Sequence, residues 1–441
     1  MSGNPEYAEM DLLRLTTAGS VDDGKSTLIG RLLYDSKSIF EDQLEAMAES
    51  SRKRGDENVN LALVTDGLRA EREQGITIDV AYRYFATPKR KFIVADTPGH
   101  EQYTRNMVTG ASTAHLSVVL VDARNGVIEQ TRRHSYLSAL LGIPHILFAI
   151  NKMDLVGWSE DCYRNIRAEI EGFLPKLDMF KDVKFIPISA LEGDNVVTPS
   201  RHSPWYEGTT LLGHLESVHN ASDWNLNAFR FPVQWVNRPN NPKDKTLHDF
   251  RGFSGQITGG IVKIGQEVLI LPSGLKSKIR EIWTYDGILE EAFSPQSVTL
   301  LLEDDIDVSR GDTIVGLDPL PGYCADLSAQ LCWMDSRPLK RNRKYFLKHG
   351  AQTVPAMVGS LDSRVNINTY ETEPEPDQLA LNDIGEVSLR TAKPLVFDGY
   401  TTNRLTGSFV LVDPETNATV AAGMLRPPSQ LYRPEYTDFS I

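Results

Sequence analysis

Nine residues near the start of the chain have the types and spacing of a phosphate-binding loop: Gly19, Ser20, Val21, Asp22, Asp23, Gly24, Lys25, Ser26 and Thr27. They follow an expected strand, 12–18, and precede an expected helix, 28–34, which is the context that the motif G-x-x-x-x-G-K-[ST] requires. Glycines allow the tight turn that directs backbone N–H groups at phosphate oxygens. The lysine can bridge the outer phosphates, and the Ser26 hydroxyl can bind Mg²⁺. The sequence therefore predicts a nucleotide site.

A second group of polar residues directly follows the apolar run 92–95: Asp96, Thr97, Pro98, Gly99 and His100. An aspartate at a strand end near the phosphate loop suits Mg²⁺ binding, and Gly99 can bring a backbone N–H close to the γ-phosphate. Asp-x-x-Gly alone is a common turn. Its occurrence together with the phosphate loop favours the interpretation as part of the nucleotide site.

Two further loops predict which base is bound. One follows the apolar run 146–150 and consists of Asn151, Lys152, Met153 and Asp154. A carboxylate accepts two hydrogen bonds, so Asp154 complements the adjacent N1–H and N2–H₂ donors of guanine, a pair that adenine lacks. Asn151 can tie this loop to the phosphate loop, and the stem of Lys152 can cover the base. The other loop, after 185–188, can reach the guanine oxygen through backbone N–H groups: Ser189, Ala190 and Leu191.

A long polar stretch, 36–83, separates the phosphate loop from Asp96 and contains Gly75, Ile76, Thr77 and Ile78. A loop of this length inside a compact domain is usually functional. One interpretation is a segment ordered by the γ-phosphate, with Thr77 closing onto Mg²⁺. The alternative, a solvated surface insertion, explains the charged residues of the stretch but leaves 75–78 unexplained.

The elements that must position these loops alternate between short apolar strands and helices from residue 12 to about 215. This pattern predicts an α/β domain with a doubly wound, mainly parallel sheet. Ligands of such sheets bind beyond the carboxyl ends of the strands, where all four loops are expected to meet. Asp122 also follows one of these strands, 116–121, but the sequence assigns it no role.

The pattern of expected strands and helices changes after this domain. Residues 220–227 are interpreted as a linker, and glycine-punctuated short strands then predict two antiparallel β-barrels. The predicted boundaries are 1–219 for the nucleotide domain and 228–320 and 325–427 for the barrels. The acidic segment 371–378 is expected to be a loop or linker. The basic run 340–344 is either a site for nucleic acid or an acidic partner, or a solvated strand edge protected by charge.

Composition excludes several classes of protein. The 441 residues carry a net charge of −13, which disfavours a chain-wide nucleic-acid footprint. Three cysteines without metal-ligand spacing favour a reducing compartment. No apolar run is long enough to span a bilayer, and the first residues lack a signal core. We expect a cytoplasmic protein without membrane contact.

The four loops and residues 75–78 together resemble the translation-factor class of GTPases. The order Asp-Thr-Pro-Gly-His, with histidine after glycine, is typical of that class, whereas small GTPases carry glutamine there. In the family this histidine orients the attacking water, a role that the resemblance assigns to His100. The resemblance also implies GTP or GDP with Mg²⁺ as cofactors, Ser26, Thr77 and Asp96 as metal-binding residues, and Lys25, Thr77 and His100 as catalytic residues.

Further segments are similar to a narrower subfamily, the GTP-binding large subunit of bacterial ATP sulfurylase, also called sulfate adenylyltransferase subunit 1. Elongation factors carry Asp-His-Gly-Lys in the phosphate loop, whereas this chain has Asp-Asp-Gly-Lys at 22–25. The similarity extends over most of the chain, from about residue 14 to 427. The segments that carry it are 71–79, 103–107, 130–134, 403–409 and 416–424.

This resemblance implies that GTP hydrolysis drives the formation of adenosine 5′-phosphosulfate and pyrophosphate from ATP and sulfate. It implies a smaller catalytic subunit as partner, and adenylylsulfate kinase as a further partner that is either separate or fused beyond residue 441. Nucleic acid is not expected as a partner. Two alternatives remain open at this stage: an elongation-factor-like carrier of aminoacyl-tRNA, and a regulatory GTPase without a coupled reaction.

Overall fold

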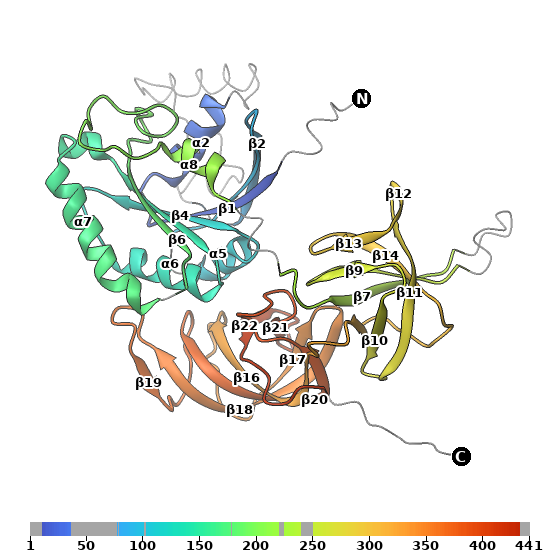
Figure 1. The fold of residues 1–441 in the computed structure, drawn as a ribbon. Coiled ribbons are helices and arrows are strands. Elements are labelled where there is room, and N and C mark those ends of the chain that lie inside the picture. Colours follow the sequence, from blue (N-terminus) through green and yellow to red (C-terminus); the bar gives the residue numbers. More distant parts are fainter. Residues whose placement is uncertain are drawn as a thin grey trace, which may run out of the picture. The chain divides into compact units, whose positions relative to one another are not determined.

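The computed structural model describes residues 11–36, 77, 79–100, 103–177, 179–219, 225–239 and 250–432. The chain divides into two compact units (Figure 1). The first comprises Met1–Asn220 together with the short segment Asn366–Glu371, and the second comprises Ala221–Val365 with Thr372–Ile441. Each unit has its own sheets and its own core.

A six-stranded sheet forms the centre of the first unit, in the order β2-β3-β1-β4-β5-β6. All neighbouring strands are parallel except the edge pair of β2 and β3. The central strands β4 and β5 are buried along their whole length, as expected for strands covered on both faces. The strands are β1 (Leu12–Ala18), β2 (Ala81–Ala86), β3 (Lys91–Asp96), β4 (Leu116–Asp122), β5 (His145–Asn151) and β6 (Asp182–Pro187).

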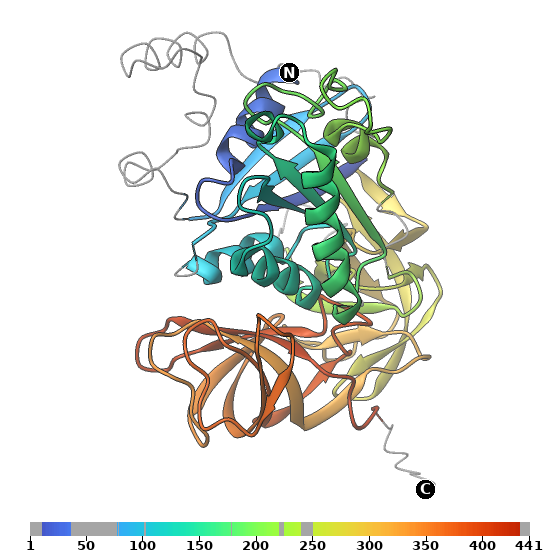
Figure 2. The same cartoon turned by 90° about the vertical axis from the view of Figure 1, so that its left-hand side faces the viewer.

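Helices cover both faces of this sheet. The connection from β1 to β3 and the connection from β3 to β4 run in opposite directions across the sheet, so right-handed crossovers place their helices on opposite faces. α2 therefore covers one face, and α5, α6 and α7 share the other (Figure 1, Figure 2). The helices are α2 (Lys25–Asp35), α5 (Thr104–Ala111), α6 (Glu129–Leu140), α7 (Glu160–Phe173) and α8 (Leu211–Ser217).

The second unit consists of two antiparallel barrels, each a closed ring of six strands. The first ring runs β10-β15-β7-β8-β14-β11 and returns to β10. Its strands, with the short β9, β12 and β13, are β7 (Arg230–Asn237), β8 (Gly252–Gln256), β9 (Ile261–Lys263), β10 (Glu267–Leu271), β11 (Leu275–Thr284), β12 (Gly287–Leu289), β13 (Glu291–Phe293), β14 (Ser297–Leu302) and β15 (Thr313–Val315). Alternating inward side chains fill its core.

The second ring runs β17-β21-β22-β16-β20-β18 and returns to β17. Its interior holds Trp333, Leu347, Val387 and other buried apolar side chains. The strands, with the short β19, are β16 (Gly322–Trp333), β17 (Lys344–His349), β18 (Gln352–Val365), β19 (Thr372–Pro374), β20 (Ile384–Phe397), β21 (Ser408–Val412) and β22 (Thr419–Leu425).

A buried ion pair joins the two barrels within the second unit. Arg230 of β7 is 2% exposed, and its guanidinium donates to both carboxylate oxygens of Asp398, at 3.0 Å each, just after β20. Thr406 donates a further hydrogen bond to this carboxylate at 2.8 Å. The first barrel supplies the arginine and the second supplies the aspartate, so this ion pair forms only when the two barrels pack together.

The predicted fold class, a GTPase-type α/β domain followed by two antiparallel barrels, is confirmed. One local expectation is wrong in part: residues 372–374, placed in a loop, form β19 and pair with β18. The sequence analysis also missed β2, because its alternating Tyr, Arg and Tyr side chains lie at a half-exposed sheet edge. The basic run 340–344 is exposed and ends at the start of β17. The exact domain boundaries stay predictions.

Among the helices in the described part of the chain, none is both long and apolar enough to cross a membrane.

Candidate nucleotide-binding site

The phosphate loop connects β1 to α2, as its sequence predicts. Gly24 immediately precedes the helix in a left-handed conformation, with a φ of 94°. A Cβ atom at this position would lie 2.5 Å from Nδ2 of Asn151, so only glycine fits. A side chain at position 24 would therefore push the Asn151 loop away from the phosphate loop.

Two charged side chains stabilise the phosphate loop from within. The carboxylate of Asp23, which is 4% exposed, accepts a hydrogen bond from the Ser20 N–H at 2.5 Å. Burial raises the pKa of Asp23, while that hydrogen bond opposes the rise. The ammonium of Lys25 donates to the carbonyls of Gly19 and Ser20, at 2.8 and 2.9 Å. Burial lowers the pKa of Lys25, and the nearby carboxylate of Asp96 opposes this most strongly.

The segment Asp96–His100 lies directly on the phosphate loop. A Cβ atom on Gly99 would be 2.1 Å from the Gly19 carbonyl and 2.5 Å from Nζ of Lys25. The Thr97 hydroxyl donates to the Thr17 carbonyl at 2.6 Å, which fixes the segment to β1. Asp96 is 2% exposed at the end of β3. The structure thus brings two of the predicted loops into contact.

Asn151 connects three of the four predicted loops. Its side-chain amide donates to the Asp23 carbonyl at 2.8 Å, and its side-chain oxygen accepts the Ala190 N–H at 2.9 Å. The Ser189 hydroxyl, fully buried, accepts the Glu192 N–H at 3.2 Å and shapes the last loop. The Ala190 N–H is thus already used by Asn151.

Lys152 and Asp154 follow in a short helical turn, Met153–Val156. Lys152 has a φ of 62°, and its ammonium donates to the Asp22 carbonyl, so its stem runs along the phosphate loop. The carboxylate of Asp154 is half-buried and accepts no hydrogen bond from the described residues. It retains its full capacity to accept two donors from a ligand. Met153 is fully buried and holds the turn in the core.

Asp122 is a site residue to which sequence reasoning gave no role. It ends β4, is 2% exposed, and contacts Lys152 Nζ at 2.9 Å and Arg124 Nη2 at 2.6 Å. Burial alone would raise the pKa of Asp122, but the hydrogen bonds from Arg124 and Lys152 outweigh it and hold the pKa well below its usual range. Its position at a strand end, facing the same crevice, was the available signal.

His100 and Thr77 each lie next to residues outside the described part of the chain. The imidazole of His100 lies 6.1 Å from the Tyr103 ring, between centroids, and the His100 carbonyl accepts the Tyr103 N–H at 3.0 Å. Thr77 is half-buried, but Gly75, Ile76 and Ile78 lie outside the described residues. Ser26 and Thr27 lie in the first turn of α2. The roles of His100, Thr77 and the Mg²⁺-binding residues stay predictions.

Comparison with known proteins identifies the domains. The family described as "Elongation factor Tu GTP binding domain" matches residues 10–228, and "GTP-eEF1A C-terminal domain-like" matches residues 326–426. The first unit is thus a GTP-binding domain, and the protein binds a guanine nucleotide.

Curated relatives match nearly the whole chain. Sulfate adenylyltransferase subunit 1 of Alteromonas mediterranea is 54% identical over 95% of this chain and 88% of its own length. Its counterpart in Aliarcobacter butzleri is 52% identical, covering 99% and 92%. The bifunctional enzyme CysN/CysC of Mycobacterium tuberculosis is 55% identical over 94% of this chain, which spans 67% of that enzyme. The chain belongs to the sulfate adenylyltransferase subunit 1 family.

Proposed function

We propose that this protein is the GTP-hydrolysing subunit of a sulfate adenylyltransferase. In the coupled reaction, ATP and sulfate form adenosine 5′-phosphosulfate and pyrophosphate, while GTP and water form GDP and phosphate. The observation that carries the proposal is identity of 52–54% to subunit 1 proteins over at least 95% of the chain. The elongation-factor fold is shared with this family, but the near full-length identity favours the sulfate enzyme over a tRNA carrier.

Base selection is assigned to Asp154, whose carboxylate has no hydrogen-bond donor among the described residues. The two N–H groups on the Watson–Crick edge of guanine supply the matching donors. Lys152 covers the base, and the Leu191 N–H donates to the guanine oxygen. Asn151 keeps these groups in register with the phosphate loop, because it is bonded to both sides at 2.8 and 2.9 Å.

Phosphate binding is assigned to Gly19–Thr27, with Lys25 bridging the outer phosphates. Lys25 is buried beside Gly99, so the segment that carries His100 lies within reach of the γ-phosphate. His100 orients the attacking water toward the γ-phosphorus, and the Gly99 N–H donates to a γ-phosphate oxygen. Thr77 closes the site from the other side once GTP is bound.

The oxygen donors of this site fit Mg²⁺. Ser26, Thr77 and Asp96 offer two hydroxyls and one carboxylate, and Mg²⁺ prefers such hard oxygen ligands completed by substrate phosphates. Among the described residues no three His, Cys, Asp or Glu side chains form a metal cage, which agrees with a metal held chiefly by the nucleotide. When bound, Mg²⁺ neutralises charge on the phosphates.

The proposal includes a smaller catalytic subunit, since the relatives are named as subunit 1 of an enzyme. It also includes an adenylylsulfate kinase as a further partner, supported by the bifunctional CysN/CysC relative. A kinase that consumes adenosine phosphosulfate would draw the unfavourable synthesis forward.

One assay tests the proposal. The chain is co-purified with the smaller subunit, and pyrophosphate release dependent on both ATP and sulfate is measured with and without GTP. We expect GTP to raise the yield of adenosine phosphosulfate, and we expect the isolated chain to produce none. GTP-independent synthesis by the complex would exclude coupling, and synthesis by the pure chain would exclude the division of labour.

A further inference from the structure

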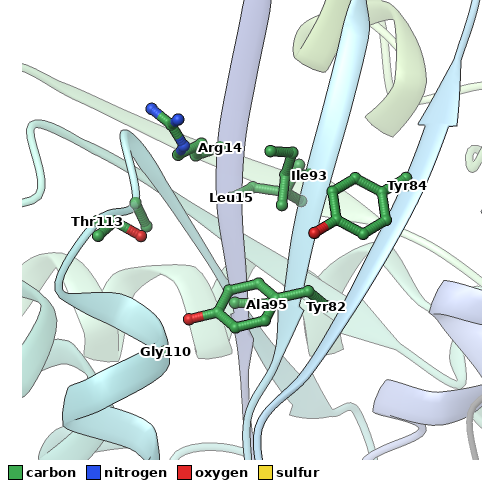
Figure 3. Close-up of a pocket in the computed structure, with 9 residues that line it drawn as sticks. Arg14, Leu15, Tyr82, Tyr84, Ile93, Ala95, Gly110 and Thr113 are labelled. Atoms are coloured by element: carbon green, nitrogen blue, oxygen red, sulfur yellow. The ribbon is translucent and has the colours of Figure 1, made fainter. Parts of the chain in front are cut away.

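A pocket that none of the nucleotide motifs explains lies on the outer part of the first sheet (Figure 3). It encloses about 220 Å³ between β1, β2, β3 and the end of α5. Ile93 and Ala95 form its floor, and Arg14, Tyr82, Tyr84 and Thr113 form its rim. We refer to these six residues as the tyrosine pocket.

Within the described part of the chain, no helix covers the sheet edge beside the tyrosine pocket. Tyr82 and Tyr84 alternate along β2, so both rings lie on one face, and they are 43% and 68% exposed. α5 packs on β1 and β3 but leaves the edge strand β2 open. Adjacent exposed tyrosines over an apolar floor are typical of protein contact sites rather than of ordinary surface.

The polar groups on the rim determine what the pocket accepts. The Arg14 guanidinium and the two tyrosine hydroxyls have no hydrogen-bond or ion-pair partner among the described residues. All three groups donate, and the guanidinium cannot accept. In a chain with a net charge of −13, an arginine without a partner beside an apolar floor is complementary to a carboxylate on a binding partner.

The walls of the pocket continue into both segments assigned to the γ-phosphate. β2 begins at Ala81, four residues after Thr77, and β3 ends at Asp96. Gly110 of α5 packs against Thr97 of the second segment and against Val80, which directly precedes β2: a Cβ atom there would lie 2.7 Å from Thr97 Cγ2 and 3.0 Å from Val80 Cγ1. A displacement of either segment therefore moves a wall of the pocket.

We propose that the tyrosine pocket receives the smaller catalytic subunit, through a segment that carries an apolar side chain next to a carboxylate. The side chain packs on Ile93 between the tyrosine rings, and the carboxylate accepts hydrogen bonds from Arg14. This rests on the proposed function, which supplies the partner. The affinity of the tyrosine pocket for the smaller subunit depends on which nucleotide is bound, because the pocket walls extend from the Thr77 and Asp96–His100 segments.

Binding of the purified smaller subunit to the full chain, loaded with a non-hydrolysable GTP analogue, tests this proposal. Tyr84→Ala removes an exposed ring, and Thr113→Trp fills the pocket from its exposed rim without deleting a buried group. We expect each variant to raise the dissociation constant of the complex about tenfold or more, the scale of an interface anchor. Arg14→Glu is expected to do the same, while Arg14→Lys retains most of the affinity.

Tyr34→Ala is the matched control, since Tyr34 is 44% exposed on α2, on the opposite face of the sheet. Its affinity for the smaller subunit is expected to change less than about twofold. GTP-analogue affinity of the free chain should be unchanged in all variants, which verifies folding.

If the pocket variants bind the smaller subunit with wild-type affinity, the proposal that the tyrosine pocket receives this subunit is overturned, while the proposed function stays intact. Equal losses in Tyr34→Ala, or self-association of the chain through the pocket, overturn it as well. A wild-type chain that binds no catalytic subunit and stimulates no synthesis overturns the proposed function instead.

Discussion

At the scale of single residues, the choice of base that we propose for Asp154 can be tested by one substitution. Asp154→Asn keeps an acceptor for guanine N1–H but replaces the acceptor opposite guanine N2–H₂ by a donor. We expect weaker GTP binding by about 2–4 kcal/mol and improved binding of xanthosine triphosphate, whose ring offers the complementary acceptor. Equilibrium titration with GTP and with xanthosine triphosphate measures both changes in affinity. Asp161→Asn, at an exposed position in the first turn of α7, is the control. Unchanged GTP affinity in the Asp154 variant would place base recognition elsewhere.

We expect Asp122 to affect nucleotide binding through Lys152, whose ammonium it contacts. Asp122→Ala removes the carboxylate that holds the Lys152 ammonium at 2.9 Å and leaves only the Asp22 carbonyl to hold it among the contacts described above, so the stem of Lys152 is fixed less firmly along the phosphate loop. We expect about tenfold weaker binding of both GTP and GDP, because one charge-assisted contact that positions the base cover is lost. The hydrolysis rate of bound GTP should stay the same. Arg124→Ala, which removes the other, 48% exposed partner of this carboxylate, should have a smaller effect. A change in hydrolysis rate alone would contradict this positioning role.

At the scale of elements, the contact between the two phosphate-proximal segments depends on Gly99. Gly99→Ala places a methyl group 2.1 Å from the Gly19 carbonyl and 2.5 Å from Lys25 Nζ, so the segments must separate. We expect GTP hydrolysis to fall at least about 10²-fold, the scale of a lost catalytic positioning group, with GDP affinity less affected. Gly172→Ala in α7 is the matched control, since a Cβ there meets nothing within 4 Å. Single-turnover hydrolysis separates the two effects, and a normal rate would show that the segments need not touch.

Helix α6 carries a buried histidine that makes the stability of the first unit depend on pH. Burial, with the positive charges of Lys25 and Arg133, lowers the pKa of His134 to about 3 from 6.5. The unfolded chain therefore binds a proton between these values that the folded chain does not bind. Stability contributed by neutral His134 is complete above pH 6.5 and is lost progressively as the pH falls toward 3. His134→Gln should flatten this part of the curve in thermal unfolding at pH 4–7. An identical slope in both proteins would refute the assignment.

Some strands and site residues could be predicted from the sequence, and others could not. The parallel strands were predictable because β4 and β5 have apolar runs at their centres, and each loop was recognisable because its residues adjoin a strand end. Asp122 was missed because its partners, Lys152 and Arg124, come together only in the folded sheet. β2 was missed because tyrosine and arginine alternate along it at a half-buried sheet edge. Such a sequence resembles that of a polar loop. β19 was missed because three exposed residues carry no periodicity.

At the scale of the whole molecule, the proposed coupling makes a reciprocal prediction. If the smaller subunit binds the GTP-loaded chain more tightly than the GDP-loaded chain, it must tighten GTP binding by the same factor. Two titrations check this: partner affinity with GDP against a non-hydrolysable GTP analogue, and analogue affinity with and without partner. A coupling of 1–3 kcal/mol is typical, corresponding to roughly 5–150-fold. Equal partner affinity in both nucleotide states would exclude an interface controlled by the γ-phosphate.

The buried pair of Arg230 and Asp398 has a consequence for inheritance. The two residues lie 168 positions apart and belong to different barrels, yet each leaves an uncompensated buried charge if the other is replaced. Such a loss typically costs about 3–5 kcal/mol. A lineage that loses the aspartate is therefore under selection to change the arginine as well, so revertants of an Asp398 allele should map to codon 230 as readily as to codon 398. The two barrels are separate in architecture, but substitutions at these two positions are expected to be inherited together.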